Sequence, residues 1–316
     1  MIQIKVKIND VGVRLDNFLI KLNIGLTKPI IYKLIRNKDI KVNNQKTIYN
    51  YRLELNDEIK IFYNVKKENL DKNLNFLNAK DLTDIIYEDN NIIIVNKPVG
   101  LLCHDDDKQT TSDTLINRIK KYLVNNKEYD FQNENQFSPS LAHRIDRNTA
   151  GLVVAAKNHV SLVSLSKIFK EHQLEKNYLA LVYGIIRKTN DVIELYLKDN
   201  KNGFVDISRI EKIGYKKAIT KYKLMEIIKN KYSLLDINLI TGRKHQIRAS
   251  LNFINYPIVG EQKYISKIID KNNKIKHQCL VAYKLKFNIY DKKDPLFYLN
   301  NKIFETNKIW FLDHIK

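Results

Sequence analysis

Several residue types are scarce in this chain of 316 residues, and each shortage excludes a class of protein. The two cysteines, Cys103 and Cys279, lie far apart and form no CxxC pair, so neither a disulfide framework nor a zinc cluster is indicated. An RNA methyltransferase would need a glycine-rich nucleotide loop after a strand, and the nine glycines provide none. No run approaches the roughly 20 apolar residues of a membrane span. Charges interrupt the start, MIQIKVKIND, where a signal peptide is apolar, so we expect a cytoplasmic protein.

Positive charge, by contrast, is in excess. Lysine and arginine number 55 against 35 aspartates and glutamates, which gives a formal net charge of +20. This excess favours a polyanionic partner. An AT-rich genome is an alternative source of lysine, because Ile, Asn and Lys dominate the whole chain. Charge alone therefore does not decide the function.

Residues 13–63 form a first predicted unit. Apolar residues at helical spacing in 14–22, and again after a plausible N-cap at Thr27, predict two helices. The segments 40–48 and 57–63 are typical of short strands. The sequence therefore predicts two helices and a small sheet.

One face of the second predicted helix is basic. Lys28, Tyr32 and Arg36 recur every four residues and share this face, which is either an ordinary solvated surface or a phosphate-binding surface. The stretch KPIIYKLIRNKDIKVNNQK (28–46) resembles the S4 RNA-binding module, whose two helices and following hairpin form a basic surface for folded RNA. The resemblance favours phosphate contact. The cations expected to make it are Lys28, Lys33, Arg36, Lys38 and Lys41.

Residues 64–80 are polar and rich in Asn and Lys, which predicts a linker. Residues 81–316 contain many short strand-like runs and few helices, the clearest at 114–126 and 161–173. We therefore expect an α+β protein in which the S4-like module is followed by a mixed, largely antiparallel domain.

Two charged clusters each adjoin a predicted strand: LAHRIDRNTAG (141–151) and TGRKHQIR (241–248). Burial would raise the pKa of Asp146 unless a cation holds it ionised. A charge pair about 4 Å apart has a gross interaction of about 4 kcal/mol at an effective dielectric of about 20, so pairing the clusters makes physical sense. A structural ion pair is the alternative that the residues alone leave open. The seven histidines include no metal-binding pair with a third ligand, so no metal is expected.

The segments LAHRIDRNTAGLVVAAKN, KNYLALVYG and LITGRKHQIRASLNFINYPIVGEQKY resemble, in that order, three signature blocks of the RluA-type pseudouridine synthases. NKPVGLLCH adds a fourth block, so the similarity covers nearly the whole chain. The resemblance implies isomerisation of uridine in structured RNA without cofactor or metal. It is closest to the RluC-like branch, which acts on large-subunit (23S) ribosomal RNA, with the RluD-like branch as the near rival. Free ribosomal RNA and a large-subunit precursor are both possible substrates.

The resemblance also implies roles for individual residues. Asp146 matches the catalytic carboxylate, and Arg248 matches the basic residue that ion-pairs with it and keeps it oriented. Tyr178 matches the tyrosine that packs against the target base and is a candidate for proton transfer. Arg144 matches the side chain that enters the RNA helix when the uridine leaves. Arg243 is expected to contact RNA phosphate, with a structural role as the alternative.

Three motifs depart from the family pattern, at Ala150, at Ala249-Ser250, and at Glu261 in place of an expected aspartate. Each is conservative in size or is expected to lie away from the substrate. Attack at C1′, addition at C6, and proton abstraction toward a glycal all remain open as the route of Asp146. A monomeric enzyme is expected, and the alternative is a non-catalytic ribosome-assembly factor that binds ribosomal RNA through the S4-like module.

Overall fold

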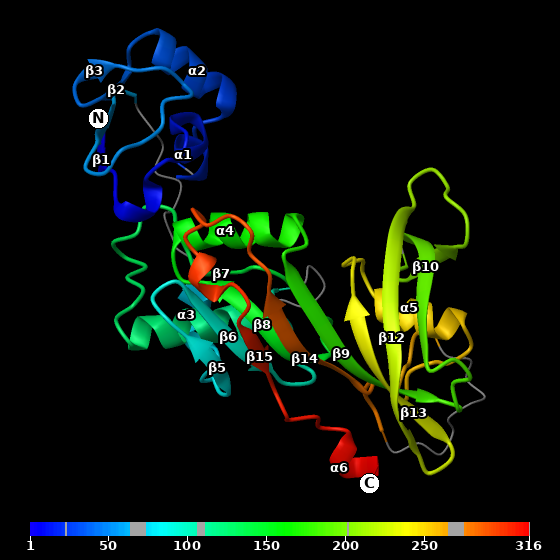
Figure 1. The fold of residues 1–316 in the computed structure, drawn as a ribbon. Coiled ribbons are helices and arrows are strands. Elements are labelled where there is room, and N and C mark those ends of the chain that lie inside the picture. Colours follow the sequence, from blue (N-terminus) through cyan, green and yellow to red (C-terminus); the bar gives the residue numbers. More distant parts are fainter. Residues whose placement is uncertain (23, 64–73, 106–110, 201, 265–274, 316) are drawn as a thin grey trace.

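The computed structural model describes the chain except for residues 23, 64–73, 106–110, 201, 265–274 and 316 (Figure 1). The first part of the predicted linker 64–80 lies outside the described residues. Its second part is packed: Leu74–Asn78 forms a short 3₁₀ helix, η2, that lies against α3 (Leu115–Asn125). Phe76 in this segment is buried, and its ring meets that of Phe131 edge to face. An apolar anchor within a polar stretch therefore shortens the linker.

The amino-terminal unit contains a four-stranded sheet in the order β1-β4-β2-β3 and two helices. Leu15, Phe18 and Leu19 recur at helical spacing and are fully buried, which is why the first helix forms where it was predicted. Asn43 and Asn44 adopt the positive φ values that a tight hairpin between β2 and β3 requires. The elements are β1 (Ile2–Lys5), a 3₁₀ turn η1 (Ile8–Asp10), α1 (Leu15–Lys21), α2 (Lys28–Arg36), β2 (Ile40–Val42), β3 (Gln45–Lys46) and β4 (Glu58–Ile61).

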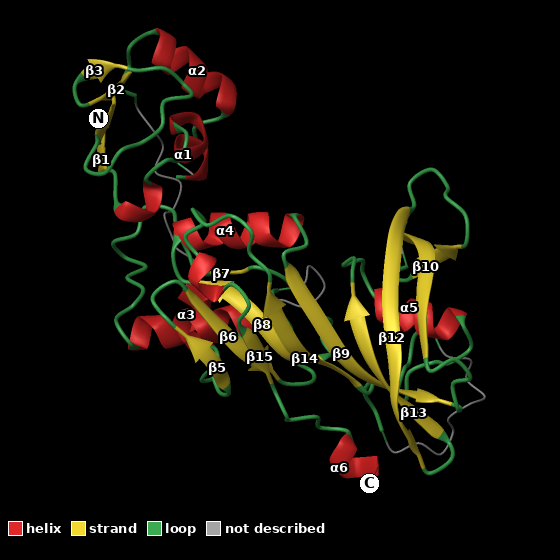
Figure 2. Cartoon of the chain, in the orientation of Figure 1, coloured by secondary structure: helices red, strands yellow, loops and turns green. Residues whose placement is uncertain are grey.

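An 11-stranded sheet dominates the second unit (Figure 2). Its main path is β11-β10-β12-β13-β9-β14-β8-β6-β5. Off this path, β15 pairs with β14 and β7 pairs with β8. The pairing of β14 with β8 is parallel, whereas the other paired strands named along this path are antiparallel. The predicted mixed, largely antiparallel α+β architecture is confirmed. The strands are β5 (Ile85–Glu88), β6 (Ile92–Lys97), β7 (Ser140–Leu141), β8 (Ala150–Ala156), β9 (Leu174–Tyr183), β10 (Asn190–Asp199), β11 (Val205–Ser208), β12 (Lys216–Ile228), β13 (Tyr232–Leu239), β14 (Leu280–Phe287) and β15 (Ile303–Glu305).

Helices cover both faces of the sheet where β6 and β8 lie. Along β6, Ile93 and Val95 belong to the apolar cluster that includes residues of α3, whereas Ile92 and Ile94 belong to the cluster that includes residues of α4 (His159–Lys170). Both faces of β6 are therefore buried, and its sequence is a continuous apolar run. Within the described residues, no helix has the length and apolar character that crossing a bilayer requires.

Helix α4 begins two residues earlier than predicted, because Asn158 caps it and accepts a hydrogen bond of 2.9 Å from the Ser161 backbone N–H. Helix α5 (Gln246–Phe253) was not predicted at all. Six of its eight residues are buried, so it has little exposed face and leaves almost no helical periodicity in the sequence. A short helix, α6 (Leu312–Ile315), ends the described chain.

Polar contacts join the amino-terminal unit to the second one. The Asn9 side chain donates to Glu134 Oε1 at 2.8 Å and accepts from the His159 backbone N–H at 3.1 Å. The Asn135 side chain donates to Asp10 Oδ2 at 2.6 Å. The polar loop around 127–138 and the start of α4 thus form the docking surface for η1.

One row of strand partners crosses the middle of the large sheet. Ala282 on β14 is paired with Tyr178 on β9 and with Gly151 on β8. Gly151 has φ +119°, and a Cβ atom there would lie 2.2 Å from the Ala282 carbonyl oxygen. Only glycine allows this close approach, and the loop that carries Asp146 leads directly into it.

We expect Gly151→Ala to lower the free energy of unfolding by about 3–5 kcal/mol, because the new methyl group must displace backbone atoms of β14. Gly100→Ala is the matched control: its φ is also positive, at +84°, but nothing lies within 4 Å of its Cβ position. For the control, the free energy of unfolding should fall by only about 1–2 kcal/mol, because alanine is disfavoured at a positive φ. Urea unfolding measures both, and equal losses would contradict the close approach.

Candidate active site

Asp146 lies in the loop between β7 and β8, and Arg248 reaches it from α5, 102 residues further along the chain. The Arg248 Nη1 atom donates to Asp146 Oδ2 at 2.8 Å. The Asp146 side chain is 30% exposed, whereas that of Arg248 is only 8% exposed. A buried guanidinium therefore orients a carboxylate that still faces solvent.

Glu261 holds the other side of the same guanidinium. It accepts from Arg248 Nε and Nη2, each at 2.7 Å, and its own side chain is completely buried. Burial by itself would lower the pKa of Arg248, but the hydrogen bonds and charge of Glu261, together with the charge of Asp146, raise it above the ordinary value. Arg248 is thus a permanent cation with its geometry set by a bidentate partner.

Gln246 fastens the start of α5 and the preceding loop to β12. Its Oε1 atom accepts from the Thr241 hydroxyl at 2.8 Å and from the Arg243 backbone N–H at 3.0 Å. Its Nε2 atom donates to the Ile219 carbonyl and the Thr220 hydroxyl, both at 3.0 Å. Because Gln246 is buried and fully bonded, the turn before Arg248 is rigidly attached to the sheet.

The loop that carries Asp146 is held through its backbone. Lys97 is fully buried, and its ammonium donates to the carbonyls of Pro98, Leu101 and Arg147 at 2.8–3.0 Å. Burial lowers the pKa of Lys97 to about 8, although the nearby charges oppose this shift. On the other side of the loop, the Gln278 amide donates to the Thr149 hydroxyl at 2.8 Å.

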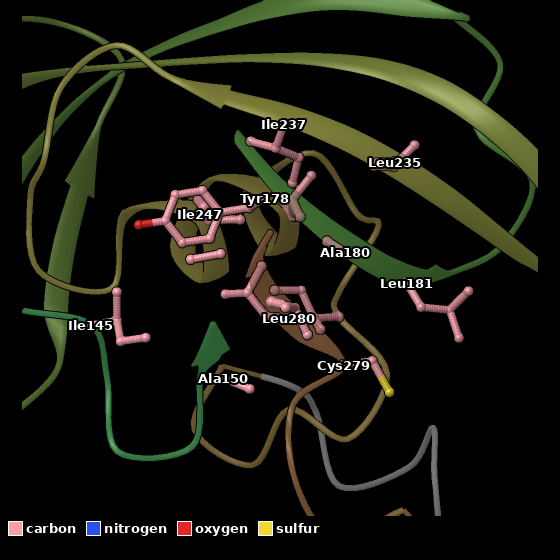
Figure 3. Close-up of a cluster of buried hydrophobic side chains, with 14 of the residues drawn as sticks. Ile145, Ala150, Tyr178, Ala180, Leu181, Leu235, Ile237, Ile247, Cys279 and Leu280 are labelled. Carbon is pink, nitrogen blue, oxygen red and sulfur yellow. The ribbon is translucent and has the colours of Figure 1, made fainter. Parts of the chain in front are cut away.

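Tyr178 lies in the apolar cluster beneath this loop (Figure 3). Its ring lies beside Ile247, and Ile145 and Leu280 belong to the same cluster. Burial, and then the negative charge of Asp146, raises the pKa of Tyr178 above its usual value. The side chain is therefore a neutral phenol at neutral pH, and it presents an apolar face beside the carboxylate.

His245 is a further neighbour of Asp146. Its Nε2 atom lies 3.8 Å from Asp146 Oδ2, and its Nδ1 atom is hydrogen-bonded to the Tyr264 hydroxyl at 2.7 Å. Burial lowers the pKa of His245 to about 4 against the opposing effect of Asp146, so the imidazole is neutral at neutral pH. The contact with Asp146 is consequently not an ion pair under those conditions.

Asp146 lines two cavities, of about 830 Å³ and 610 Å³, which we call the larger and the smaller cavity. Both are also lined by Arg144, His245 and Arg248. Cations outnumber carboxylates in the larger cavity, which therefore suits a polyanion. Its charged lining residues are Arg144, Lys170, Lys176, Arg243, Lys244 and Arg248 against Asp146 and Asp199.

Residues 91–253 match the RNA pseudouridylate synthase family, and residues 13–59 match the S4 domain family. An "uncharacterized RNA pseudouridine synthase" of Mycoplasma capricolum is 40% identical, over 96% of this chain and 96% of that protein. The "ribosomal large subunit pseudouridine synthase C" of Rickettsia bellii is 36% identical, over 79% of this chain and 82% of that protein. The chain belongs to the RNA pseudouridylate synthase family.

A solved human structure shares the fold of this synthase. Human RNA pseudouridylate synthase domain containing 4 superimposes with a TM-score of 0.55 at 20% identity, and the match covers 73% of this chain and 90% of that one. The predicted family membership, the S4 domain and the enzyme class are thus confirmed. RNA binding follows from the two families together.

The synthase brings three of the predicted site residues together: Asp146, Tyr178 and Arg248. Arg144 is exposed and lines both cavities. Arg243 is also exposed, lines the larger cavity, and donates through Nε to the Lys217 carbonyl at 3.1 Å. This side chain thus has both a structural bond and a place in the cavity wall.

The predicted cations of the S4 domain lie away from this site, on α2 and the turn and strand that follow it. Lys28, Lys33, Arg36 and Lys38 are exposed, whereas Lys41 is half-buried with its ammonium 5.4 Å from the centre of the Phe62 ring. The apolar stripe of α2, including Ile31 and Leu34, is buried as expected.

Two polar residues of the site were missed by sequence reasoning. Glu261 was noted only as a departure from the family pattern that is conservative in size or lies away from the substrate, yet it binds Arg248 directly. The acidic position of the family pattern was the available signal. Lys97 lies within the motif NKPVGLLCH, but nothing in the sequence indicated that its ammonium would bind backbone carbonyls. His143 proved structural: it accepts from the Val154 backbone N–H at 3.2 Å, and burial lowers its pKa to about 3.

We expect Glu261→Gln to slow pseudouridine formation by about tenfold or more, equivalent to about 1.4 kcal/mol of barrier. The amide keeps the size of the side chain but removes the charge and one acceptor, so the guanidinium of Arg248 loses its bidentate partner. Single-turnover rates measure the effect, and filter binding should show unchanged RNA affinity. Glu305→Gln, at an exposed ion pair with Lys284, is the control. Equal rates for both variants would show that Asp146 alone suffices to orient Arg248.

Proposed function

We propose that this synthase isomerises specific uridines of large-subunit (23S) ribosomal RNA to pseudouridine, with Asp146 as the catalytic carboxylate. The observation that carries the proposal is the Asp146–Arg248–Glu261 array, which holds one oriented, partly exposed carboxylate at the edge of two cationic cavities. A fixed guanidinium 2.8 Å away holds the carboxylate in one orientation, as a nucleophile or base requires.

The glycosidic bond of a stacked nucleotide is out of reach, so the target must first leave the RNA helix, at a cost of a few kcal/mol. Arg144, exposed at the border of both cavities, is suited to fill the gap that the base leaves. The N1–C1′ bond then breaks, the uracil rotates, and a C5–C1′ bond forms. C5 loses its proton and N1 gains one, so the substrate supplies every heavy atom of the product.

Tyr178 is proposed to pack against the target base and to take part in proton transfer. Its ring forms part of the wall of the larger cavity, and its raised pKa keeps a proton on the hydroxyl. Attack of Asp146 at C1′, addition to C6, and proton abstraction toward a glycal are each compatible with this arrangement.

The proposed RNA is supported by the Rickettsia relative, whose name specifies the ribosomal large subunit, and by the S4 domain with its exposed cations on α2. An RluC-like specificity is the version we propose. We further propose residues 13–63 as the S4 unit and 81–316 as the catalytic unit of a cytoplasmic monomer. The side chains of Cys103 and Cys279 are both buried and are not joined in a disulfide, which is compatible with a reducing compartment.

Asp146→Asn should abolish the reaction, with a loss of at least about a thousandfold, or about 4 kcal/mol of barrier. The amide fills the same space but can act neither as nucleophile nor as base. Pseudouridine mapping on unmodified large-subunit ribosomal RNA and on its precursors measures the outcome and identifies the sites.

Asp199→Asn is the matched control, because Asp199 lines the same larger cavity and should not affect the rate. Activity in the Asp146→Asn protein would rule out the catalytic assignment. Absence of new pseudouridines on every RNA, even with the unaltered protein, would favour the non-catalytic assembly factor instead.

Neutralising α2 should weaken the dependence of RNA binding on salt. Each phosphate contact contributes about 0.7–0.9 to the slope of log affinity against log salt, so replacing Lys28, Lys33 and Arg36 with Gln should reduce the slope by about 2. Titrations over a range of potassium chloride concentrations measure this change.

A control variant with the same loss of charge replaces Lys212, Lys229 and Lys292, all exposed in the catalytic unit, with Gln. An identical slope for the two triple variants would mean that α2 makes no particular contact with phosphate.

A further inference from the structure

Lys176 is a half-buried cation in the wall of the larger cavity whose ammonium has no hydrogen-bond acceptor or carboxylate partner among the described residues. Two other buried lysines are paired. Lys97 donates to three carbonyls, and Lys157, with a side chain 6% exposed, lies between Glu88 and Glu128. A partly desolvated charge without a partner costs stability, and an anionic ligand would offset that cost.

The immediate surroundings of Lys176 are aromatic and uncharged. Its Nζ atom lies 5.7 Å from the centre of the Phe169 ring, and the His143 ring stacks on Phe169 with the two ring centres 4.9 Å apart. Because burial lowers the pKa of His143 to about 3, the imidazole is neutral. No carboxylate of the described residues neutralises the ammonium, and the Phe169 ring packs beside its aliphatic stem and positive head.

The position of Lys176 relative to the proposed reaction centre is set by strand geometry. Lys176 and Tyr178 are two residues apart on β9, so they point to the same face of the sheet with their Cα atoms about 7 Å apart. Both line the larger cavity with Asp146. The Nζ atom also lies near Gly242, where an added Cβ atom would be 3.9 Å from it.

We propose that the Lys176 ammonium binds a phosphodiester of the RNA strand that carries the target uridine, beside the base that packs on Tyr178. This assignment rests on the proposed function. A phosphodiester supplies the missing anion, and every nucleotide of the substrate has one within a single sugar of its base. Arg243 and Lys244, on the loop across the cavity, reinforce the attraction for that strand.

The test compares Lys176→Met, which keeps the aliphatic stem, with Lys176→Arg, which keeps the charge. Met should raise the half-saturating RNA concentration about ten- to a hundredfold and leave the single-turnover rate at saturation nearly unchanged. It should also reduce the salt slope by about 0.7, whereas Arg should retain most of the affinity. Lys212→Met, at an exposed lysine outside both cavities, controls for the general loss of charge. Thermal melting checks that each variant is folded.

Single methylphosphonate substitutions in a uridine-loop RNA hairpin separate phosphate binding from a structural role. The unaltered protein and Lys212→Met should lose affinity when one particular phosphodiester beside the target uridine is made uncharged. Lys176→Met should be insensitive to that substitution but should respond normally at the other positions.

The proposal is overturned if Lys176→Met responds to every methylphosphonate as the unaltered protein does, or if it lowers the saturated rate with no change in half-saturation. A contact with the uracil itself would produce the first of these results. If the unaltered protein modifies no RNA, the proposed function fails. Equilibrium binding of the same hairpins then still decides whether Lys176 contacts phosphate.

Discussion

The structure depends on one buried guanidinium that two carboxylates share. Arg248 binds Asp146 through one nitrogen and Glu261 through two, and its side chain is almost completely removed from solvent. Removing such a cation from water costs several kcal/mol, which only well-placed anions can offset. Three segments must therefore meet at a fixed geometry. Gly260, with φ +77° and a hypothetical Cβ atom 2.1 Å from the His277 carbonyl oxygen, sets the turn that brings Glu261 inward.

The rest of the site is arranged to hold these segments by backbone hydrogen bonds. Lys97 binds three carbonyls around the loop of Asp146, and the Cys103 thiol lies 3.4 Å from the Ile145 carbonyl. Gln246 performs the same task for the start of α5. The backbone N–H and C=O groups of a buried loop lack partners within the loop, so buried side chains must form hydrogen bonds with them. The result is a rigid site in which Asp146 retains access to solvent.

Recognition of RNA can be divided between the two units. The exposed cations of α2 lie on a domain that contacts the catalytic unit through Asn9 and Asn135, so the two surfaces have a defined relation in this structure. Within the catalytic unit, the cationic wall of the larger cavity adjoins the apolar ring of Tyr178. In the proposed mechanism, charge attracts the strand and the apolar surface receives the base that leaves it.

The sequence by itself determined the periodic elements and the family. Apolar spacing located α1 and α3 within a residue or so, and the ordered motifs led to Asp146, Tyr178 and Arg248 as one predicted site. Only the tertiary structure decided that Glu261 completes the ion pair, that η2 packs on α3, and that α5 exists as a helix. The physical reason is burial. A helix that is buried on most sides shows little periodicity in its sequence. Charges far apart in the chain become partners only when the folded sheet brings them together.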